Sequence, residues 1–312
     1  MTMQLLIIAT ILSLLFSGGA GGCRTKNFNV PPRQSQSSTG QKDNTVENQN
    51  QTSGDLKVIA QGFHSSITDP FIAVVRDEAT YAELRKLDGN LPKLNVDLKT
   101  NTVIAAFLGE RNTGGYSVEI TRVANGEIQI AEKAPAKDVM VPQVITAPFK
   151  IVSLPVEGTE PVKISAGDAF RQTAQLYRID KGSFTISGGF AGRSETYALA
   201  GKLQITRLGD LVTVGFAVVS TGTSHERSLR DVATGVMKEN SFDISRMSRG
   251  SLVDPPTGDL RVAGKFLDAN RLNLDLDTGG AIVPDGFQGK GTIEAQMVSA
   301  SANEWVARAP CA

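Results

Sequence analysis

Histidine and cysteine, the usual sources of catalytic bases, thiol nucleophiles and zinc ligands, are scarce in this chain. The 312 residues include only His64 and His225, and only Cys23 and Cys311. No Cys-x-x-Cys pair and no Cys/His cluster is present, so we expect no structural zinc site. A disulfide between Cys23 and Cys311 would join the two ends of the chain, and we do not expect it to form.

Net charge and aromatic residues are also lacking. Lys+Arg and Asp+Glu are 32 each, so the formal net charge is zero. Nucleic-acid-binding proteins usually carry basic patches or stripes, and we therefore expect no nucleic-acid partner. Aromatic residues make up 6% of the chain while glycine occurs 31 times, which favours short strands and many turns over a helical bundle. The length has room for roughly two domains.

The motifs of common enzymes are missing or incomplete. Ser224-His225-Glu226 suggests a hydrolase, but adjacent residues of a strand point in opposite directions and cannot act together as nucleophile and base. No G-x-S-x-G motif surrounds this serine. The Gly289-Lys290-Gly291 sequence lacks the Ser or Thr that follows the lysine of a Walker loop. We therefore expect a protein that is not an enzyme, with no catalytic residues and no cofactor.

The stretch from Asn273 to Gly279 (NLDLDTG) is similar in part to a calcium-binding loop. Its glycine falls one place late, and Pro284 stands where a bidentate Glu is needed. Leucines alternate with polar residues throughout the same stretch, and this period of two is typical of a half-buried strand. We interpret it as a strand without a metal site.

The N-terminus resembles a bacterial lipoprotein signal peptide. The apolar run from Leu5 to Phe16 is short for a membrane span and has the length of a signal-peptide core. Small residues then lead to Cys23, as in a lipobox, although no Lys or Arg precedes the run and Ala20 stands where Leu is commonest. We expect residues 1–22 to be removed and Cys23 to be lipidated with acyl chains such as palmitate. Ordinary cleavage near Gly22 is the alternative.

Residues 23–54 have the composition of a disordered tether. Gln, Ser, Asn, Thr and Gly dominate, and large apolar residues nearly vanish. Such a segment cannot bury enough surface to offset the entropy of ordering it, and its mean reach is about 30 Å. Arg24 follows Cys23 in place of the Asp associated with inner-membrane retention in enteric bacteria. We therefore expect a membrane-anchored protein of the bacterial cell envelope, at the outer membrane, either periplasmic or surface-exposed.

The next part of the chain centres on the stretch from Val103 to Val118 (VIAAFLGERNTGGYSV). Its apolar run up to Leu108 is typical of a buried strand. The alternation that begins at Tyr116 is typical of a half-buried strand. A polar corner with a Gly pair separates the two, which predicts a hairpin with Arg111 at the tip of its loop.

Other patterns complete this region. The sequence predicts strands at Leu56–Ala60 and Phe71–Val75, a helix with Asp77 as its N-cap, a turn at Asn125-Gly126, and a closing strand at Val144–Val152 interrupted at Pro148.

The segment GERNTGGYSV, residues 109–118, resembles the core motif of the PrcB-type C-terminal domain. That family occurs in bacterial lipoproteins associated with an exported protease complex. The resemblance covers roughly residues 58–155 and includes the closing segment QVITAPFKIV at residues 143–152. It implies a small α+β domain, which we place at residues 55–157, and an exported protease as partner. It implies no catalytic residues.

The loop at residues 109–116 is the candidate partner-binding site. Gly109, Gly114 and Gly115 are expected to shape a turn. Arg111 is not needed by a turn, and its planar fork of donors is favoured at protein interfaces. The candidate contact residues are Glu110, Arg111, Asn112, Thr113 and Tyr116.

The second domain, residues 162–312, shows repeated period-2 alternation with Gly-rich turns, and we recognise no family in it. Short strands at regular spacing predict an antiparallel sandwich or barrel. The polar stretch from Thr221 to Asp259 is expected to contain a long loop. The fold class predicted for the whole chain is therefore mainly β, with a small α+β domain followed by a β-sandwich or barrel.

Four functional interpretations remain open. The first is a lipid-anchored envelope protein whose first domain binds, and stabilises or retains, an exported partner such as a secreted protease. The second is a carrier of a small apolar ligand inside a barrel formed by the second domain. The Thr-Gly-Gly-Tyr loop also resembles chagasin-type inhibitors of cysteine proteases, which implies a loop-based protease inhibitor. A hydrolase with an unrecognised arrangement would be a fourth kind of protein.

Overall fold

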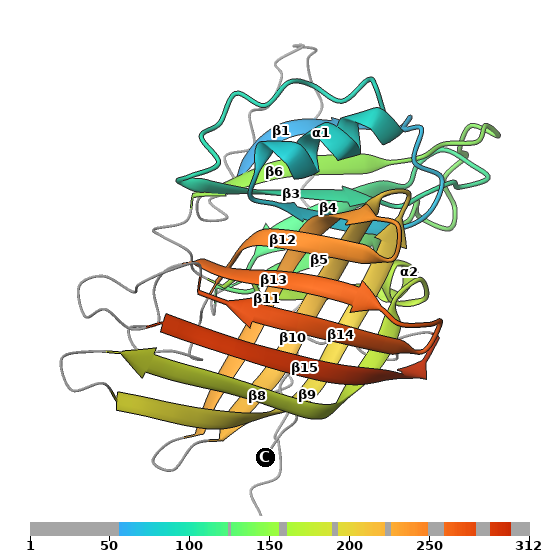
Figure 1. The fold of residues 1–312 in the computed structure, drawn as a ribbon. Coiled ribbons are helices and arrows are strands. Elements are labelled where there is room, and N and C mark those ends of the chain that lie inside the picture. The colour runs from blue at the N-terminus through green and yellow to red at the C-terminus, as the bar shows by residue number, and fades with distance from the viewer. Residues whose placement is uncertain are drawn as a thin grey trace, which may run out of the picture. The chain divides into compact units, whose positions relative to one another are not determined.

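The structure is a computed structural model, and it describes residues 56–123, 126–155, 161–188, 193–221, 226–248, 259–278 and 288–300. The fold is mainly β, as predicted, with a small α/β region followed by a closed barrel (Figure 1). Cys23, the predicted tether, Ser224, His225 and Cys311 lie outside the described residues. No helix in the described ranges is long and apolar enough to cross a membrane.

The first sheet has the strand order β1-β6-β3-β2 and is antiparallel throughout. Its strands are β1 (Lys57–Gly62), β2 (Phe71–Val75), β3 (Asn101–Phe107) and β6 (Phe149–Pro155). Helix α1 (Glu78–Leu87) covers one face, and Asp77 caps it by accepting a hydrogen bond from the Thr80 N–H, as the sequence predicted. Leu84 is the fully buried centre of the helix face.

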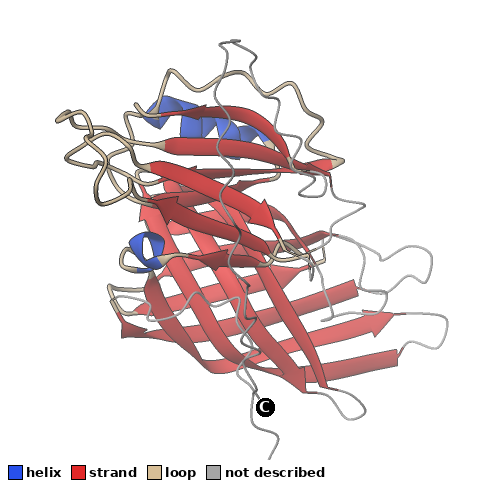
Figure 2. Ribbon diagram, turned by 180° about the vertical axis from the view of Figure 1, so that it is seen from behind, coloured by secondary structure: helices blue, strands red, loops and turns tan. Residues whose placement is uncertain are grey.

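A second sheet covers the opposite face of the first, so that this region has three layers (Figure 2). Its strands are β4 (Ser117–Arg122), β5 (Ile128–Lys133) and the short parallel strand β7 (Ile164–Ala166). The helix α2 (Asp168–Arg171) follows, and Phe170 is buried in the same core. Residues 164–171 therefore pack with the domain that the sequence analysis placed at residues 55–157.

The hairpin predicted between the Val103 run and the Tyr116 run is wrong. β3 pairs with β2 and β6, whereas β4 pairs with β5 in the other sheet. The physical reason lies in the buried run itself. Alternate residues of β3 enter the helix-side core (Ala105) and the core between the sheets (Ile104), so β3 packs between two layers. β2 and β6 occupy both of its edges, and no edge is left for the strand that follows Tyr116. The hairpin at Gly126 joins β4 to β5 instead, with Ile120 opposite Ile130.

Residues 175–299 supply the eight antiparallel strands of the barrel. The strands are β8 (Gln175–Gly188), β9 (Arg193–Leu208), β10 (Leu211–Thr221), β11 (Glu226–Lys238), β12 (Ser241–Ser248), β13 (Asp259–Phe266), β14 (Arg271–Asp277) and β15 (Gln288–Ser299). They pair in chain order, and β15 returns to β8 and closes the barrel. Of the two predicted architectures, the barrel is the one observed.

The stretch from Thr221 to Asp259, which was expected to contain a long loop, includes the strands β11 and β12. Residues 249–258, between β12 and β13, lie outside the described residues. The polar composition of this stretch does not mean that all of it is exposed, because some of its polar residues are buried within the fold. Asp231 and Thr234 of β11 are both buried.

The interior of the barrel is packed with side chains. Apolar residues from its strands form one cluster that includes Tyr177, Phe184 and Phe242. Glycines on the wall make room for the rings: a Cβ on Gly264 would lie 2.0 Å from Phe242 Cζ, and one on Gly289 would lie 2.5 Å from Phe184 Cζ. The rings therefore fill space that larger wall residues would occupy.

β2 is the outer strand of the first sheet, and the barrel covers its edge. The Val74 N–H donates to Thr234 Oγ1 at 2.8 Å, and Thr213 Oγ1 donates to the Ile72 carbonyl at 2.7 Å. Two barrel hydroxyls thus satisfy backbone groups that an edge strand would otherwise leave unpaired.

A buried ion pair joins the same two parts of the chain. Arg76 directly follows β2 and forms two hydrogen bonds of 2.8 Å with the carboxylate of Asp231 on β11. The two side chains are 6% and 0% exposed. Asp231 Oδ1 also accepts hydrogen bonds from the N–H groups of Val162 and Val232. The carboxylate is therefore surrounded by donors in a site without water access.

Candidate partner-binding surface

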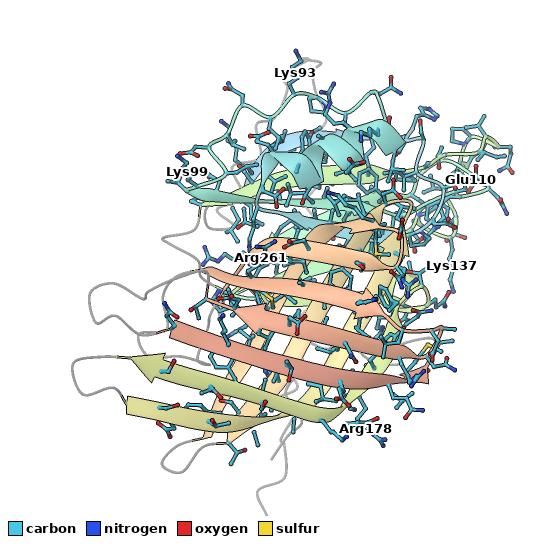
Figure 3. All side chains as sticks on the ribbon, in the orientation of Figure 1. Lys93, Lys99, Glu110, Lys137, Arg178 and Arg261 are labelled. Carbon is cyan, nitrogen blue, oxygen red and sulfur yellow. The ribbon has the colours of Figure 1, made fainter. Side chains whose placement is uncertain are left out.

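Three loops meet at one end of the first sheet, and we call residues 63–70, 108–116 and 134–148 the loop cluster (Figure 3, where Glu110 and Lys137 are labelled). Backbone hydrogen bonds join the loops. Arg111 and Thr146 exchange two, the Gly114 N–H donates to the Pro142 carbonyl, and the Ala147 N–H donates to the Phe63 carbonyl. The predicted motif therefore holds two other loops in place.

The Arg111 side chain points into the loop cluster. Its Nε and Nη2 donate to the two carboxylate oxygens of Glu132 on β5, at 2.9 and 3.0 Å. Its Nη1 donates to the carbonyls of Leu108 and Glu110. The guanidinium carbon lies 5.8 Å from the centre of the Tyr116 ring. Each nitrogen is therefore used within the fold.

These contacts correct the expectation of an exposed Arg111 at the tip of a loop. The side chain is only 19% exposed, and its ion-pair partner lies on a different strand. A bidentate, partly buried pair of this kind fixes geometry as well as adding energy. Arg111 thus orients the 108–116 loop against β5, a role that the turn pattern did not reveal.

Two of the three predicted loop glycines have the left-handed backbone that favours glycine. Gly109 has φ +72°, and a Cβ there would lie 2.4 Å from the Thr68 carbonyl oxygen. Gly115 has φ +86°, and its Cβ would lie 2.9 Å from Pro135 Cβ. Gly114 does not have a positive φ, and its Cβ would lie 3.2 Å from the Pro142 ring. Gly114 therefore allows its loop to pack closely against Pro142.

The other predicted contact residues divide into exposed and inward-facing groups. Glu110 and Asn112 are exposed. Thr113 is half-buried, and its carbonyl accepts a hydrogen bond from Thr146 Oγ1. Tyr116 is half-buried and packs against the core between the sheets. Only Glu110 and Asn112 therefore have the exposure that direct contact with a partner requires.

The most exposed apolar side chains of the loop cluster lie outside the predicted motif. Met140 is 98% exposed and Ile145 is 64% exposed. Five of the nine large apolar side chains that are exposed in the described residues belong to this cluster. We call these five the apolar loop surface: Phe63, Val139, Met140, Val144 and Ile145.

The sequence contained a signal for this surface that we did not use. The segment VMVPQVITAP at residues 139–148 is apolar and contains Pro142 and Pro148, yet it does not alternate as a half-buried strand would. The structure shows β6 beginning only at Phe149, with Thr146 forming an isolated bridge to Arg111. The part assigned to the closing strand before Pro148 is thus loop, with Val144 and Ile145 exposed and Thr146 and Ala147 buried.

Residues 102–155 match the family model described as PrcB C-terminal, which runs from β3 to the end of β6. This segment belongs to the PrcB C-terminal family. The match includes both residues of the Arg111–Glu132 ion pair and four of the five residues of the apolar loop surface. No curated protein and no solved structure matches the chain.

The remaining candidate residues for catalysis or metal binding lie apart from one another in the described residues. His64 is exposed within the loop cluster, and the stretch from Asn273 to Asp277 is part of β14, as the alternation predicted. Within the described ranges, no three His, Cys, Asp or Glu residues are placed to hold a metal ion. Burial raises the pKa of Tyr81 and of Tyr177, and both rings lie in packed cores.

Proposed function

We propose that this protein is a lipid-anchored component of the bacterial cell envelope that binds an exported partner protein through the apolar loop surface of its PrcB C-terminal domain. The observation that carries the proposal is the concentration of exposed apolar side chains on loops that are held by backbone hydrogen bonds. Exposed apolar groups of this kind mark sites of protein association. Loops that are ordered before binding lose less entropy when a partner docks.

The family match supports a partner that is itself exported. The PrcB C-terminal resemblance implies association with a secreted protease, and stabilisation or retention of that protease is the role we propose. The charged and polar residues at the margin of the apolar loop surface, Glu110 and Asn112, would form the rim of the interface. An apolar centre with a polar rim is the usual organisation of protein interfaces.

A paired substitution tests this function. Met140→Asp combined with Ile145→Asp places two charges in the centre of the proposed interface, where burying them on binding is costly. We expect the partner to co-purify with the parent protein from detergent-solubilised envelopes and to be lost with this variant. Val298→Asp on β15 is the matched control, because Val298 is an exposed apolar residue of the barrel. A partner retained equally by all three proteins would contradict the proposal.

The membrane anchor is tested separately. Lipidation requires the Cys23 thiol, so Cys23→Ser should abolish acylation and move the protein from the membrane to the soluble fraction. A single acyl chain binds membranes only marginally, whereas two or more anchor a protein firmly. Membrane fractionation with metabolic labelling by a palmitate analogue measures both effects. A serine variant that stays as fully with the membranes as the parent would show that the anchor is wrong.

The packing of the barrel bears on the carrier interpretation. A carrier of small apolar molecules needs an internal cavity, usually of several hundred Å³. The described interior residues instead form a side-chain core in which Phe184 and Phe242 fill the space over wall glycines. The inhibitor interpretation is likewise less favoured, because Gly114 is buried and Tyr116 lies beneath Arg111 rather than projecting from the loop.

A further inference from the structure

The methionines of the described residues lie in two different environments. Met247 is fully buried, and Met237 and Met297 are half-buried, so that all three pack in or against the interior of the barrel. Met140 lies on the apolar loop surface and is 98% exposed. Within the part of the chain that the structure describes, Met140 is therefore the one methionine whose side chain is fully open to solvent.

Backbone hydrogen bonds hold the chain on both sides of Met140. The Val139 N–H donates to the Ala136 carbonyl at 3.2 Å, and the Gly114 N–H donates to the Pro142 carbonyl at 2.8 Å. These bonds fix the loop immediately before and shortly after Met140, and they leave its side chain outside the fold. The loop thus presents the Met140 thioether to solvent.

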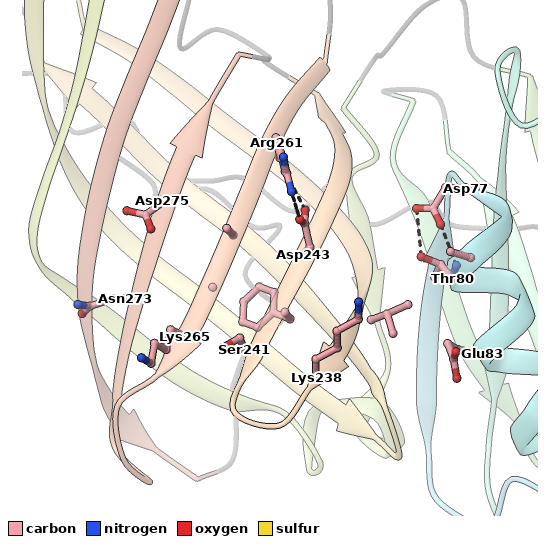
Figure 4. A pocket seen from close by; sticks show the side chains of 15 residues that line it. Asp77, Thr80, Glu83, Lys238, Ser241, Asp243, Arg261, Lys265, Asn273 and Asp275 are labelled. Carbon is pink, nitrogen blue, oxygen red and sulfur yellow. Dashed lines mark hydrogen bonds and ion pairs between the residues drawn. The ribbon is translucent and has the colours of Figure 1, made fainter. Parts of the chain in front are cut away.

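The neighbours of Met140 on this surface are apolar. Val139 and Ile145 are exposed beside it in the chain and belong to the same surface. The groove between helix α1 and the barrel wall is different, because carboxylates and cations line it together and no methionine does (Figure 4). A chemical change that makes Met140 polar would therefore alter the apolar loop surface and leave this groove unchanged.

An exposed thioether is open to oxidation. Oxidation to methionine sulfoxide turns a flexible apolar side chain into a polar one. With hydrogen peroxide as the oxidant, the sulfur attacks one peroxide oxygen, an S–O bond forms and the O–O bond breaks. The proton on the transferred oxygen passes to the departing hydroxide, which leaves as water. The sulfur is oxidised by two electrons, and the peroxide is reduced by two electrons.

We propose that Met140 is a peroxide-sensitive modification site, and that its sulfoxide weakens the binding of a partner to the apolar loop surface. The second part rests on the proposed function, whereas the first part rests on the exposure of Met140 alone. A sulfoxide oxygen accepts hydrogen bonds from water, and covering it with an apolar partner surface removes them at a cost in free energy. Oxidation of Met140 therefore opposes docking without disturbing the barrel core.

Mass spectrometry of peptides tests the modification site. The purified full-length protein is treated briefly with hydrogen peroxide and then digested. We expect the Met140 thioether to be oxidised at least about tenfold faster than that of Met247, because susceptibility follows exposure and Met247 is fully buried. Bound partner should slow the oxidation of Met140 by covering it. Equal rates at Met140 and Met247 in the folded protein would overturn the site.

A binding measurement tests the effect on the partner. The affinity of the co-purified partner is measured before and after the same treatment, and the ratio of the two values is compared between proteins. Oxidation should weaken binding to the parent by about tenfold. Met140→Leu cannot form the sulfoxide, so its ratio should stay near one whatever its starting affinity. Met297→Leu is the matched control on the barrel, and its ratio should equal that of the parent.

The outcomes separate this proposal from the proposed function. Weakening in the parent and in Met297→Leu, but not in Met140→Leu, supports the proposal. Equal weakening in all three proteins, or unchanged binding once Met140 is fully oxidised in the parent, overturns the claim about binding. If no partner co-purifies with the untreated parent, the proposed function fails and the claim about binding fails with it. The oxidation rates of Met140 and Met247 still decide the modification site in that case.

Discussion

Replacing Asp231 with alanine is expected to lower the free energy of unfolding by about 3–5 kcal/mol. The substitution removes the Asp231 carboxylate from the buried Arg76 guanidinium, and it also removes an acceptor of the Val162 and Val232 N–H groups. An unpaired buried charge costs more than the intact pair contributes. Urea denaturation followed by circular dichroism measures the effect as a shift of the midpoint.

A double substitution is the control for this result. Arg76→Met with Asp231→Leu removes both charges, and we expect it to recover a large part of the lost stability. Recovery should be incomplete because the Val162 N–H loses its acceptor, whereas the Val232 N–H keeps its hydrogen bond to the Val162 carbonyl. Since the pair joins the β2–α1 junction to the barrel, the Asp231→Ala change should shift the unfolding of both parts together. An Asp231→Ala protein as stable as the parent would show that the pair is not buried as described.

Gly109→Ala is expected to cost about 3 kcal/mol, the second-largest effect. Gly109 has φ +72°, and the new Cβ would lie 2.4 Å from the Thr68 carbonyl oxygen, a backbone atom that cannot move without its loop. The Glu110 N–H donates to that same carbonyl, so the clash also disturbs a hydrogen bond between two loops of the cluster. Thermal or urea denaturation measures the loss.

Substitutions at two other glycines distinguish the two causes of the Gly109→Ala destabilisation, which are the positive φ and the contact with Thr68. Gly126 has φ +78° but only the end of the Arg122 side chain near its Cβ position, so Gly126→Ala should cost about 1 kcal/mol from conformation alone. Gly114→Ala has no positive φ and meets only the Pro142 ring at 3.2 Å, so it should cost less than about 1 kcal/mol. Equal effects at all three positions would contradict the assignment of the Gly109 cost to the Thr68 contact.

The sequence predicted the elements of the first domain better than their pairing. Period and composition located the strand at Val103 and the alternating strand after Tyr116, because both patterns report which faces are buried. Which edges pair is decided by contacts between distant residues, such as Val103 with Ser153 in β6. Burial of both faces does not report the pairing either, since β2 is as buried as β3 and lies at the edge of the same sheet.

The roles of the site residues were harder to predict. Arg111 was expected to be exposed because the sequence places it between a polar corner and a Gly pair. Its partner Glu132 is 21 residues away and becomes adjacent only when β5 pairs with β4. The apolar loop surface was missed because valine and isoleucine near Pro148 were read as strand. Exposure of such residues depends on where the sheet ends, which no local pattern reports.

The barrel illustrates a similar limit. Alternation fixes which residues face inward, and this prediction agrees with the cluster that contains Leu272, Leu274 and Leu276. Alternation is the same in a sandwich and in a barrel, and the choice between them rests on the pairing of β15 with β8. That contact joins residues more than a hundred positions apart, such as Phe184 and Gly291.

The central claim, that the PrcB C-terminal domain binds its partner through the apolar loop surface, is tested most directly by measuring the affinity of the co-purified partner for three proteins. Met140→Asp with Ile145→Asp should weaken binding by about a hundredfold relative to the parent, since interface centres carry most of the binding energy. Val298→Asp should bind as the parent does. If the double variant binds the partner as tightly as the parent while remaining folded, the apolar loop surface is not the binding site.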